Sequence, residues 1–327
     1  MNLHQTALAR SNGYALLSDL FLNGVTAENW PTVQQTDLAV HLPEEPDFEQ
    51  LAAQHYDLIS HQIFPYESAF LSEDGMLGGE VANQVLHYFE QIRLPLETAV
   101  SEPDHIGWEL YALSFLCGAE ADAWEDGLQE VALRMQHQQQ RFLESHLLRW
   151  SPAFLVGVLR QERPFYTAIG ELLWGLLTTH YKHSESVLSS PLTLPEPPNV
   201  LADEKAGLRD IVAVLIRPCY AGWFISRRDI TVLSRQFELP HGFGSKEQML
   251  LNLLRSAVQY DAMPQLLNQL IDMAEQWEKA YEQLAEGEIG GFIRPWQNRL
   301  HQTKNFLSHI LQKTKDTPAD FSSLSKK

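Results

Sequence analysis

The 327-residue chain has only two cysteines, Cys117 and Cys219. They lie far apart in apolar stretches, and neither belongs to a Cys-x-x-Cys pair. A disulfide framework and a cysteine-based metal site are therefore poorly supported. We expect two buried thiols in a reducing compartment, where cysteine behaves as a small apolar residue.

Long hydrophobic runs are absent as well. No stretch approaches the roughly 20 apolar residues that a membrane helix needs, and no basic N-terminal region leads into an apolar segment. We therefore expect neither a membrane span nor an export signal, and we expect a cytoplasmic protein.

Enzymatic motifs are equally scarce. Gly75, Gly78 and Gly79 follow no predicted strand and precede no Lys-Ser/Thr pair, so they do not form a Walker-type phosphate loop. A Gly-x-Ser-x-Gly turn and a compact set of Cys, His and carboxylate metal ligands are also missing. We expect no catalytic residue, no metal and no other cofactor. One enzymatic alternative stays open, a small-molecule or nucleotide-binding enzyme with Asp104 and His105 as an acid–base pair.

Basic residues are few in the first part of the chain. Residues 1–203 hold 8 Lys/Arg against 28 Asp/Glu, whereas residues 204–327 hold 16 against 14. Such an acidic field repels nucleic acids and anionic lipids and attracts basic partners. The alternative is that the acidic surface only keeps the protein soluble. We expect no nucleic-acid partner and no stable membrane insertion.

Alternating strand patterns are also lacking, and apolar residues instead recur at three- and four-residue steps. This periodicity predicts an all-α protein. The predicted helices cover residues 3–23, 48–62, 79–92, 102–117, 120–148, 151–160, 164–183, 204–217, 226–237, 245–259, 263–284 and 291–313.

Proline marks the predicted domain boundary. Residues 187–203 contain Pro191 and the run Pro195-Glu196-Pro197-Pro198, which is too rich in proline for a helix and typical of a stiff linker. We therefore predict a helical domain over 1–186, a second helical lobe over 204–313 and a flexible tail over 314–327.

Titratable side chains gather at the start of one apolar helical run, in Ser101-Glu102-Pro103-Asp104-His105-Ile106-Gly107-Trp108-Glu109-Leu110. Helix capping explains part of this segment: Ser101 as the cap, Pro103 in the first turn, and Asp104 near the positive helix end. Capping leaves Glu102, His105 and Trp108 unexplained.

This segment resembles the E-P-x-D-H signature of the TorD/DmsD/NarJ family of redox-enzyme maturation chaperones. In this chain Pro103 directly precedes Asp104, without the intervening residue of that signature. Three further segments are similar to the family in order and spacing, and together they extend over about the first 185 residues: Ile63–Leu71, Phe142–Trp150 and Pro164–Tyr166. The resemblance implies an all-helical fold without catalytic activity, a TorD-like bundle followed by the second lobe.

The resemblance also implies a partner, the precursor of a molybdenum-cofactor oxidoreductase, bound at its twin-arginine signal peptide or as the apo protein. An alternative is a NarJ-like assembly factor that binds the body of a leaderless client. For leader binding, Glu102 and Asp104 are the preferred carboxylates for the arginines, with Glu67 and Glu109 as weaker candidates. His105 would order the acids or tune binding with pH. The other expected peptide-binding residues are Phe64, Pro65, Tyr66, Pro103 and Trp108. Both a monomer and a dimer remain possible.

An internal segment, Ser226-Arg227-Arg228-Asp229, superficially resembles the twin-arginine consensus. Its simplest interpretation is a capping box formed by Ser226 and Asp229 at a helix start. The alternative is that the arginine pair docks on the acidic part of the chain as a pseudo-substrate.

Overall fold

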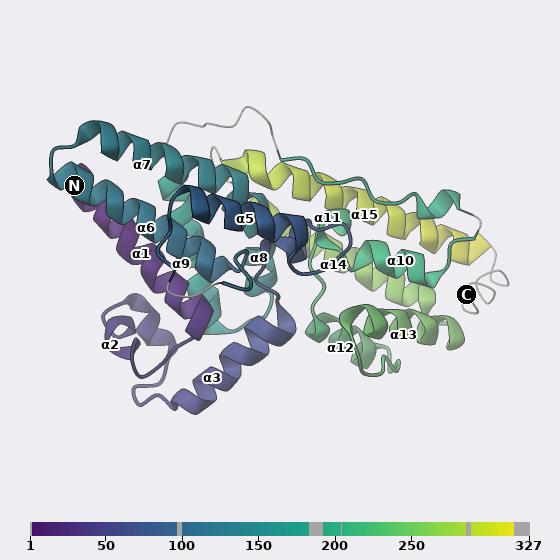
Figure 1. Cartoon of the computed structure of the whole chain (residues 1–327). Helices are drawn as coiled ribbons and strands as arrows, with labels where there is room; N and C mark the ends of the chain where they lie inside the picture. The colour runs from purple at the N-terminus through teal and green to yellow at the C-terminus, as the bar shows by residue number, and fades with distance from the viewer. Residues whose placement is uncertain (1, 97–99, 183–191, 204, 286–288, 317–327) are drawn as a thin grey trace. The chain divides into compact units, whose positions relative to one another are not determined.

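The computed structural model describes residues 2–96, 100–182, 192–203, 205–285 and 289–316. Within these ranges all regular elements are helical, and the only extended pairing is one isolated antiparallel bridge between Tyr66 and His105. The predicted all-α class is confirmed (Figure 1).

The chain divides into two compact units. Unit 1 comprises residues 1–192 and 287–292, and unit 2 comprises residues 193–286 and 293–327. The short return of 287–292 to unit 1 was not predicted from the sequence. Of the predicted linker and tail, residues 187–191 and 317–327 lie outside the described residues.

Unit 1 is organised around two helices, α1 (Leu3–Asn23) and α6 (Ile106–Glu125), which pack along each other (Figure 1). Local sequence sets the bounds of α1, as predicted. Asn2 caps the helix by accepting from the Gln5 N–H at 2.8 Å, and the helix ends at Gly24, whose φ of +70° favours glycine. Glycine also allows the close packing, because a Cβ at Gly107 would lie 2.4 Å from Leu22 of α1.

The remaining predicted helices of unit 1 are present with altered bounds. Residues 118–119, between two predicted helices, are helical, and the short helices at 30–33, 37–41 and 67–71 were not among the predicted ones. The predicted helix 48–62 is α-helical only to Tyr56 and continues as a π-helix, and the predicted helix 120–148 is interrupted after Glu125, where Gly127 has a φ of +71°. The elements are α2 (Trp30–Val33), η1 (Asp37–His41), α3 (Phe48–Tyr56), η2 (Asp57–Gln62), α4 (Glu67–Leu71), α5 (Gly79–Gln91), α7 (Gln129–Phe142), η3 (Leu143–Leu147), α8 (Leu148–Leu159) and α9 (Pro164–Lys182).

A buried polar chain links four of these helices. Tyr14 of α1 lies 2.9 Å from His180 Nδ1 of α9, and His180 Nε2 lies 3.0 Å from Gln139 Oε1 of α7. Gln139 in turn donates to Glu120 of α6 at 3.0 Å. Buried polar groups must find partners, so this chain fixes the relative register of the four helices more specifically than apolar contacts alone.

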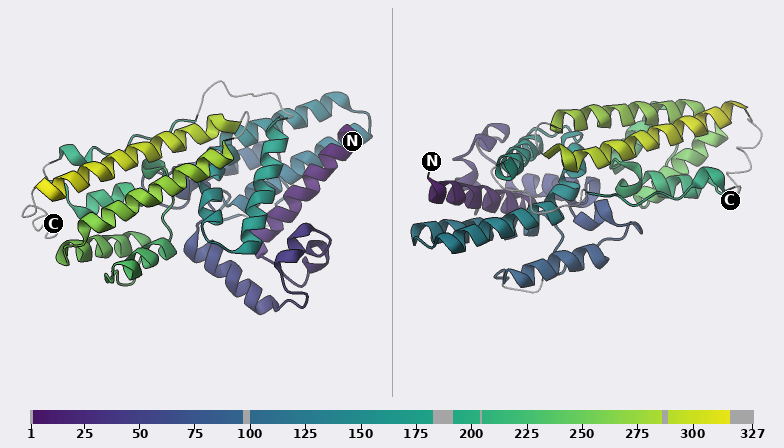
Figure 2. Two further views of the ribbon diagram at one scale, coloured as in Figure 1. Left: turned by 180° about the vertical axis from the view of Figure 1, so that it is seen from behind. Right: turned by 90° about the horizontal axis from the view of Figure 1, so that it is seen from above.

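Unit 2 contains η4 (Val200–Ala202), α10 (Leu208–Leu215), α11 (Pro218–Ala221), α12 (Arg227–Gln236), α13 (Lys246–Gln259), α14 (Met263–Leu284) and most of α15 (Gly290–Asp316). The long helices α14 and α15 run side by side (Figure 2), and Lys304 joins them by an ion pair of 2.7 Å to Glu278. The predicted capping box at α12 is confirmed, since Asp229 N–H donates to Ser226 Oγ at 3.0 Å and Ser226 N–H donates to the Asp229 carboxylate at 2.8 Å.

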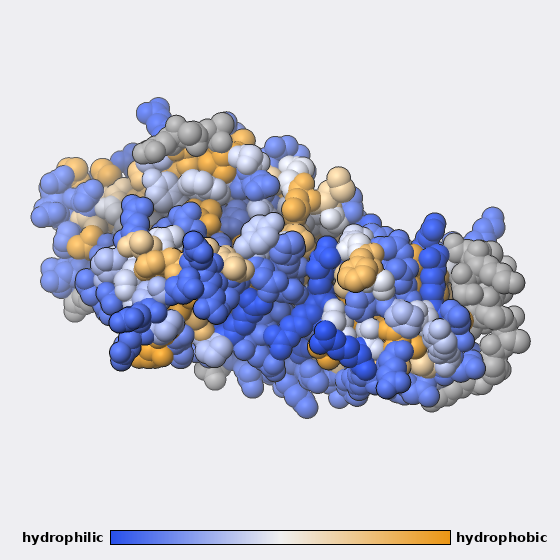
Figure 3. Space-filling model, turned by 90° about the horizontal axis from the view of Figure 1, so that it is seen from below, coloured by the Kyte–Doolittle hydropathy of each residue, from blue (hydrophilic) through white to orange (hydrophobic). Residues whose placement is uncertain are grey.

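The apolar residues are mostly inside. Both cysteines are buried, as predicted. On the face that Figure 3 shows, hydrophilic residues predominate and hydrophobic ones form small separate patches. None of the helices in the described part of the chain is both long and apolar enough to cross a membrane.

Candidate functional site

The two motif segments of the sequence meet in space. Tyr66 and His105 form the isolated bridge, in which Glu67 N–H donates to the Asp104 carbonyl at 2.9 Å and Ile106 N–H donates to the Pro65 carbonyl at 2.8 Å. Residues 63–71 and 101–110 are therefore parts of one site, although the bridged residues Tyr66 and His105 are 39 positions apart in the sequence.

The start of α6 differs from the sequence prediction. The helix begins at Ile106, and its N-cap is His105, whose Nδ1 accepts from the Gly107 N–H at 3.0 Å. Ser101 is not the cap, and Pro103 precedes the helix. The Asp104 side chain does not cap α6. It accepts a hydrogen bond from the Ser68 N–H at 2.9 Å. A long-range hydrogen bond thus replaces the expected local one, and it fixes α4 to the motif.

A pocket of about 420 Å³ lies beside this bridge. Four of the predicted site residues line it, namely Tyr66, Glu102, His105 and Trp108. The sequence did not single out the rest of the wall, which comes mainly from the end of α1 and from α3 and η2: Phe21, Leu22, His55, Tyr56, Ile59, Ser60, Val100 and Ser101. The only signal for them is the helical spacing of His55 with Ile59 and of Tyr56 with Ser60, which places each pair on one face.

Glu102 is the exposed carboxylate of the pocket. The Tyr66 hydroxyl donates to it at 3.1 Å. Burial and then the negative charge of Glu102 raise the pKa of Tyr66 to about 12, so the hydroxyl keeps its proton and holds the carboxylate in place. The pocket therefore offers an oriented anion within a partly aromatic wall, which suits a guanidinium on an apolar segment.

Two histidines line the same pocket and are held neutral. Burial and then the charge of His55 lower the pKa of His105 to about 4. Burial also lowers the pKa of His55, opposed by its hydrogen bond to the Phe21 carbonyl. Tyr66 packs edge-on against His105, with ring centroids 5.0 Å apart. With a pKa of about 4, His105 is uncharged near neutral pH, so its predicted role in ordering the acids or tuning binding with pH stays a prediction.

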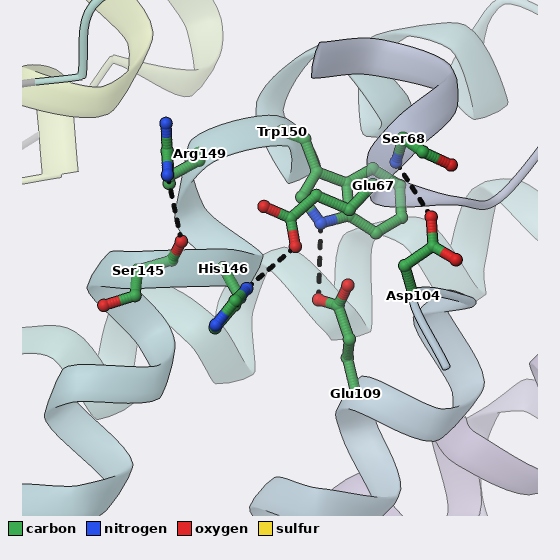
Figure 4. A network of polar contacts seen from close by, with 8 residues as sticks. All are labelled: Glu67, Ser68, Asp104, Glu109, Ser145, His146, Arg149 and Trp150. Carbon is green, nitrogen blue, oxygen red and sulfur yellow. Dashed lines mark hydrogen bonds and ion pairs between the residues drawn. The ribbon is translucent and has the colours of Figure 1, made fainter. Parts of the chain in front are cut away.

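The other predicted carboxylates are buried and are not part of the pocket wall. Glu67, Asp104 and Glu109 are at most 2% exposed. Figure 4 shows their arrangement: Glu67 contacts His146 at 2.9 Å, and the Trp150 indole donates to Glu109 at 3.3 Å. Burial and the charges of Glu67 and Asp104 raise the pKa of Glu109 well above its ordinary value. Direct pairing of these three acids with a ligand would require them to become exposed.

The predicted apolar and aromatic residues of the site also fall into two groups. Tyr66 and Trp108 line the pocket, and the other three do not. Pro65 and Pro103 are buried, and Phe64 is only partly exposed. None of the three is part of the described pocket wall, so their contribution to peptide binding stays a prediction.

A larger cavity of about 730 Å³ lies on another side of α3. Its Arg163 is already ion-paired with Asp57 and donates to the Gln54 carbonyl at 3.0 Å. We favour the smaller pocket as the functional site, because it contains the motif residues and an exposed, oriented carboxylate.

Comparison with known proteins identifies the family. Residues 26–156 match the protein family described as nitrate reductase delta subunit. A chaperone protein TorD from Psychrobacter sp. (strain PRwf-1) is 32% identical over 182 residues, which cover 53% of this chain and 77% of that protein. The chain belongs to the TorD family of chaperones. A further TorD chaperone, from Vibrio vulnificus (strain YJ016), is 30% identical over 110 residues, or 32% of this chain and 50% of the relative.

No solved structure matches the chain. The predicted family resemblance is confirmed, and the relatives' description as chaperones supports a protein that is not an enzyme. The geometry of the TorD-family motif agrees, because Asp104 and His105 direct their side chains to Ser68 N–H and Gly107 N–H rather than to each other.

Proposed function

We propose that this TorD-family chaperone binds the twin-arginine leader of a molybdenum-cofactor oxidoreductase precursor in the cytoplasm, and holds it until the client enzyme is mature. The observation that carries this proposal is the Glu102 carboxylate, oriented by the Tyr66 hydroxyl at 3.1 Å at a pocket that the family motif lines. A guanidinium of the leader pairs with Glu102, and the apolar part of the leader packs on the pocket wall.

The charge of the chain supports this partner. Residues 1–203 carry a net charge of −20, which attracts a cationic leader over long distances and speeds encounter at low salt. The buried acids have a different role in this proposal. Asp104 is a positioning residue, since it holds the start of α4 by its hydrogen bond to Ser68 N–H.

Calorimetry with a synthetic twin-arginine peptide tests the proposal. We expect Glu102→Gln to weaken binding about 3- to 30-fold, the range for one charge-assisted hydrogen bond in a partly exposed site. A Lys-Lys peptide should bind more weakly than the Arg-Arg peptide, because lysine cannot pair with a carboxylate through two parallel hydrogen bonds.

Glu125→Gln is the matched control, because it removes the same charge from an exposed position at the far end of α6, the helix that follows Glu102. It should leave affinity nearly unchanged. Equal losses in the two variants would reduce the effect to net charge, and an absence of arginine-dependent binding would refute the proposal.

The family match over residues 26–156 favours a second candidate, an assembly factor that binds the body of its client rather than a leader. In that case the twin-arginine peptide would not bind, whereas the leaderless apo client subunit would form a complex with the chaperone. The stoichiometry of that complex would also show whether the chaperone acts as a monomer or as a dimer.

A further inference from the structure

Two histidines in the pocket wall present opposite hydrogen-bonding groups. We propose that His55 and His105 form a clamp for one peptide unit of the bound segment, in which His55 accepts from a main-chain N–H and His105 donates to a main-chain carbonyl. This inference rests on the proposed function, and it adds a register-setting contact with the client's backbone to the pairing of Glu102 with the client's arginine.

The contacts of His55 fix its tautomer. Its Nε2 lies 3.1 Å from the Phe21 carbonyl, and a carbonyl oxygen can only accept, so Nε2 carries the hydrogen. In the neutral ring Nδ1 is then a bare acceptor, and it has no hydrogen bond to any residue that the structure describes. The ring packs closely over Gly24, and only glycine leaves room for it, because a Cβ there would lie 2.9 Å from His55 Cγ.

The contacts of His105 fix the opposite tautomer. Its Nδ1 accepts from the Gly107 N–H at 3.0 Å and must therefore be bare. The hydrogen of the neutral ring is on Nε2, which likewise has no partner among the described residues. The ring cannot rotate without losing the cap of α6, so the orientation of this N–H donor is set by the helix start.

One acceptor and one donor on the same pocket wall match an extended peptide, because every non-proline peptide unit offers one N–H and one carbonyl. Recognition of the main chain is independent of side chains. Such a clamp would hold leaders of different sequence in one register, and Glu102 would then select the segment that places an arginine beside it. In this arrangement the two histidines contribute affinity for any peptide main chain, and Glu102 contributes selectivity for an arginine.

The clamp requires neutral histidines. The titratable groups around His55 are Tyr56 of α3, Tyr66 at the start of α4, Glu102 before α6, His105 at the start of α6, and Tyr166 of α9. The ring centroid of Tyr166 is 6.5 Å from that of His55. Protonation of His55 would turn its acceptor into a donor and repel the peptide N–H. Affinity should therefore be constant above pH 7 and fall at acidic pH, as the pH drops through the pKa of His55, which burial lowers from the ordinary 6.5.

Two variants distinguish the contribution of the histidines to peptide binding from their contribution to the protein's own structure. His105→Asn keeps an acceptor for Gly107 N–H, since asparagine is a good N-cap, but it lacks the Nε2 donor. His55→Gln keeps a donor for the Phe21 carbonyl and removes the titrating acceptor. Each should weaken binding of the twin-arginine peptide about three- to tenfold at pH 7.5, and His55→Gln should also abolish the acid loss.

The same contact can be removed from the peptide side. Single N-methylation along the twin-arginine peptide removes one main-chain donor at a time, and one position should weaken binding to the native protein yet have little further effect on His55→Gln. His87→Gln is the control for histidine loss, because His87 is exposed on α5, away from the pocket.

The outcomes distinguish the two proposals. If the parent peptide binds and depends on Glu102, but affinity is unchanged in both histidine variants or N-methyl losses are additive with His55→Gln, the clamp is refuted and the proposed function stands. If the parent peptide does not bind at all, the proposed function fails and the clamp fails with it.

Discussion

The buried acid Glu109 allows a sharp test of the site's electrostatics. Its side chain is fully buried, one oxygen accepts from the Trp150 indole at 3.3 Å, and the other has no hydrogen-bond partner in the described structure. Burial, the charge of Glu67 and the charge of Asp104 all raise the pKa of Glu109 above the ordinary 4.5. The folded protein therefore retains a proton that the unfolded chain would release.

The direction of the pH effect follows from this proton. The folded state binds it more tightly, so its contribution to stability is complete below about pH 4.5 and is lost as the pH rises through the raised pKa of Glu109. The variant Glu109→Gln keeps the shape and the acceptor for Trp150 but needs no proton. At pH 8.5 we expect it to be more stable than the native protein by about 1–3 kcal/mol, because each unit by which folding raises the pKa of Glu109 costs the native protein about 1.4 kcal/mol at a pH where the unfolded chain is ionised.

Urea denaturation followed by tryptophan fluorescence measures this difference, because Trp150 is completely buried. The stabilisation should shrink at pH 5.5, where Glu109 of the native protein holds its proton. Glu67→Gln is the matched control. It should destabilise at both pH values, because Glu67 lies 2.9 Å from His146 in a buried pair. A Glu109→Gln variant that is less stable at pH 8.5, or equally pH-dependent, would refute this account.

Two substitutions at glycines test the packing. Gly107→Ala should destabilise unit 1 by about 1–3 kcal/mol, because the new Cβ would meet Leu22 at 2.4 Å, whereas Gly118→Ala in the same helix meets only the Ser11 hydroxyl at 3.3 Å and should be nearly neutral in thermal melting. Gly222→Ala should destabilise unit 2 by about 2–6 kcal/mol, because Gly222 has a φ of +76° and its Cβ would meet the backbone N of Leu300 at 2.4 Å. A urea midpoint within experimental error of the native value would contradict either prediction.

The sequence determined the features that depend on near neighbours. Apolar periodicity located most of the helices, and local caps set their ends, as at Asn2 for α1 and in the Ser226–Asp229 box for α12. The family signature was equally readable, because it is a run of adjacent residues. The lack of strand patterns and of a sufficiently long apolar run likewise pointed to an all-α chain without a membrane helix.

The tertiary structure decided what each signature residue does. The sequence suggested Ser101 as the cap of α6. In the structure the Asp104 side chain accepts from the Ser68 N–H, and His105 is the cap, since it accepts from the Gly107 N–H. Of the four carboxylates proposed for arginine pairing, only Glu102 stays exposed in the pocket wall. His55 joins that wall from a helix distant in the sequence, with its helical spacing to Ile59 as the only local signal. Burial and long-range hydrogen bonds made these choices, and both depend on residues tens of positions apart, which the spacing of neighbouring residues does not encode.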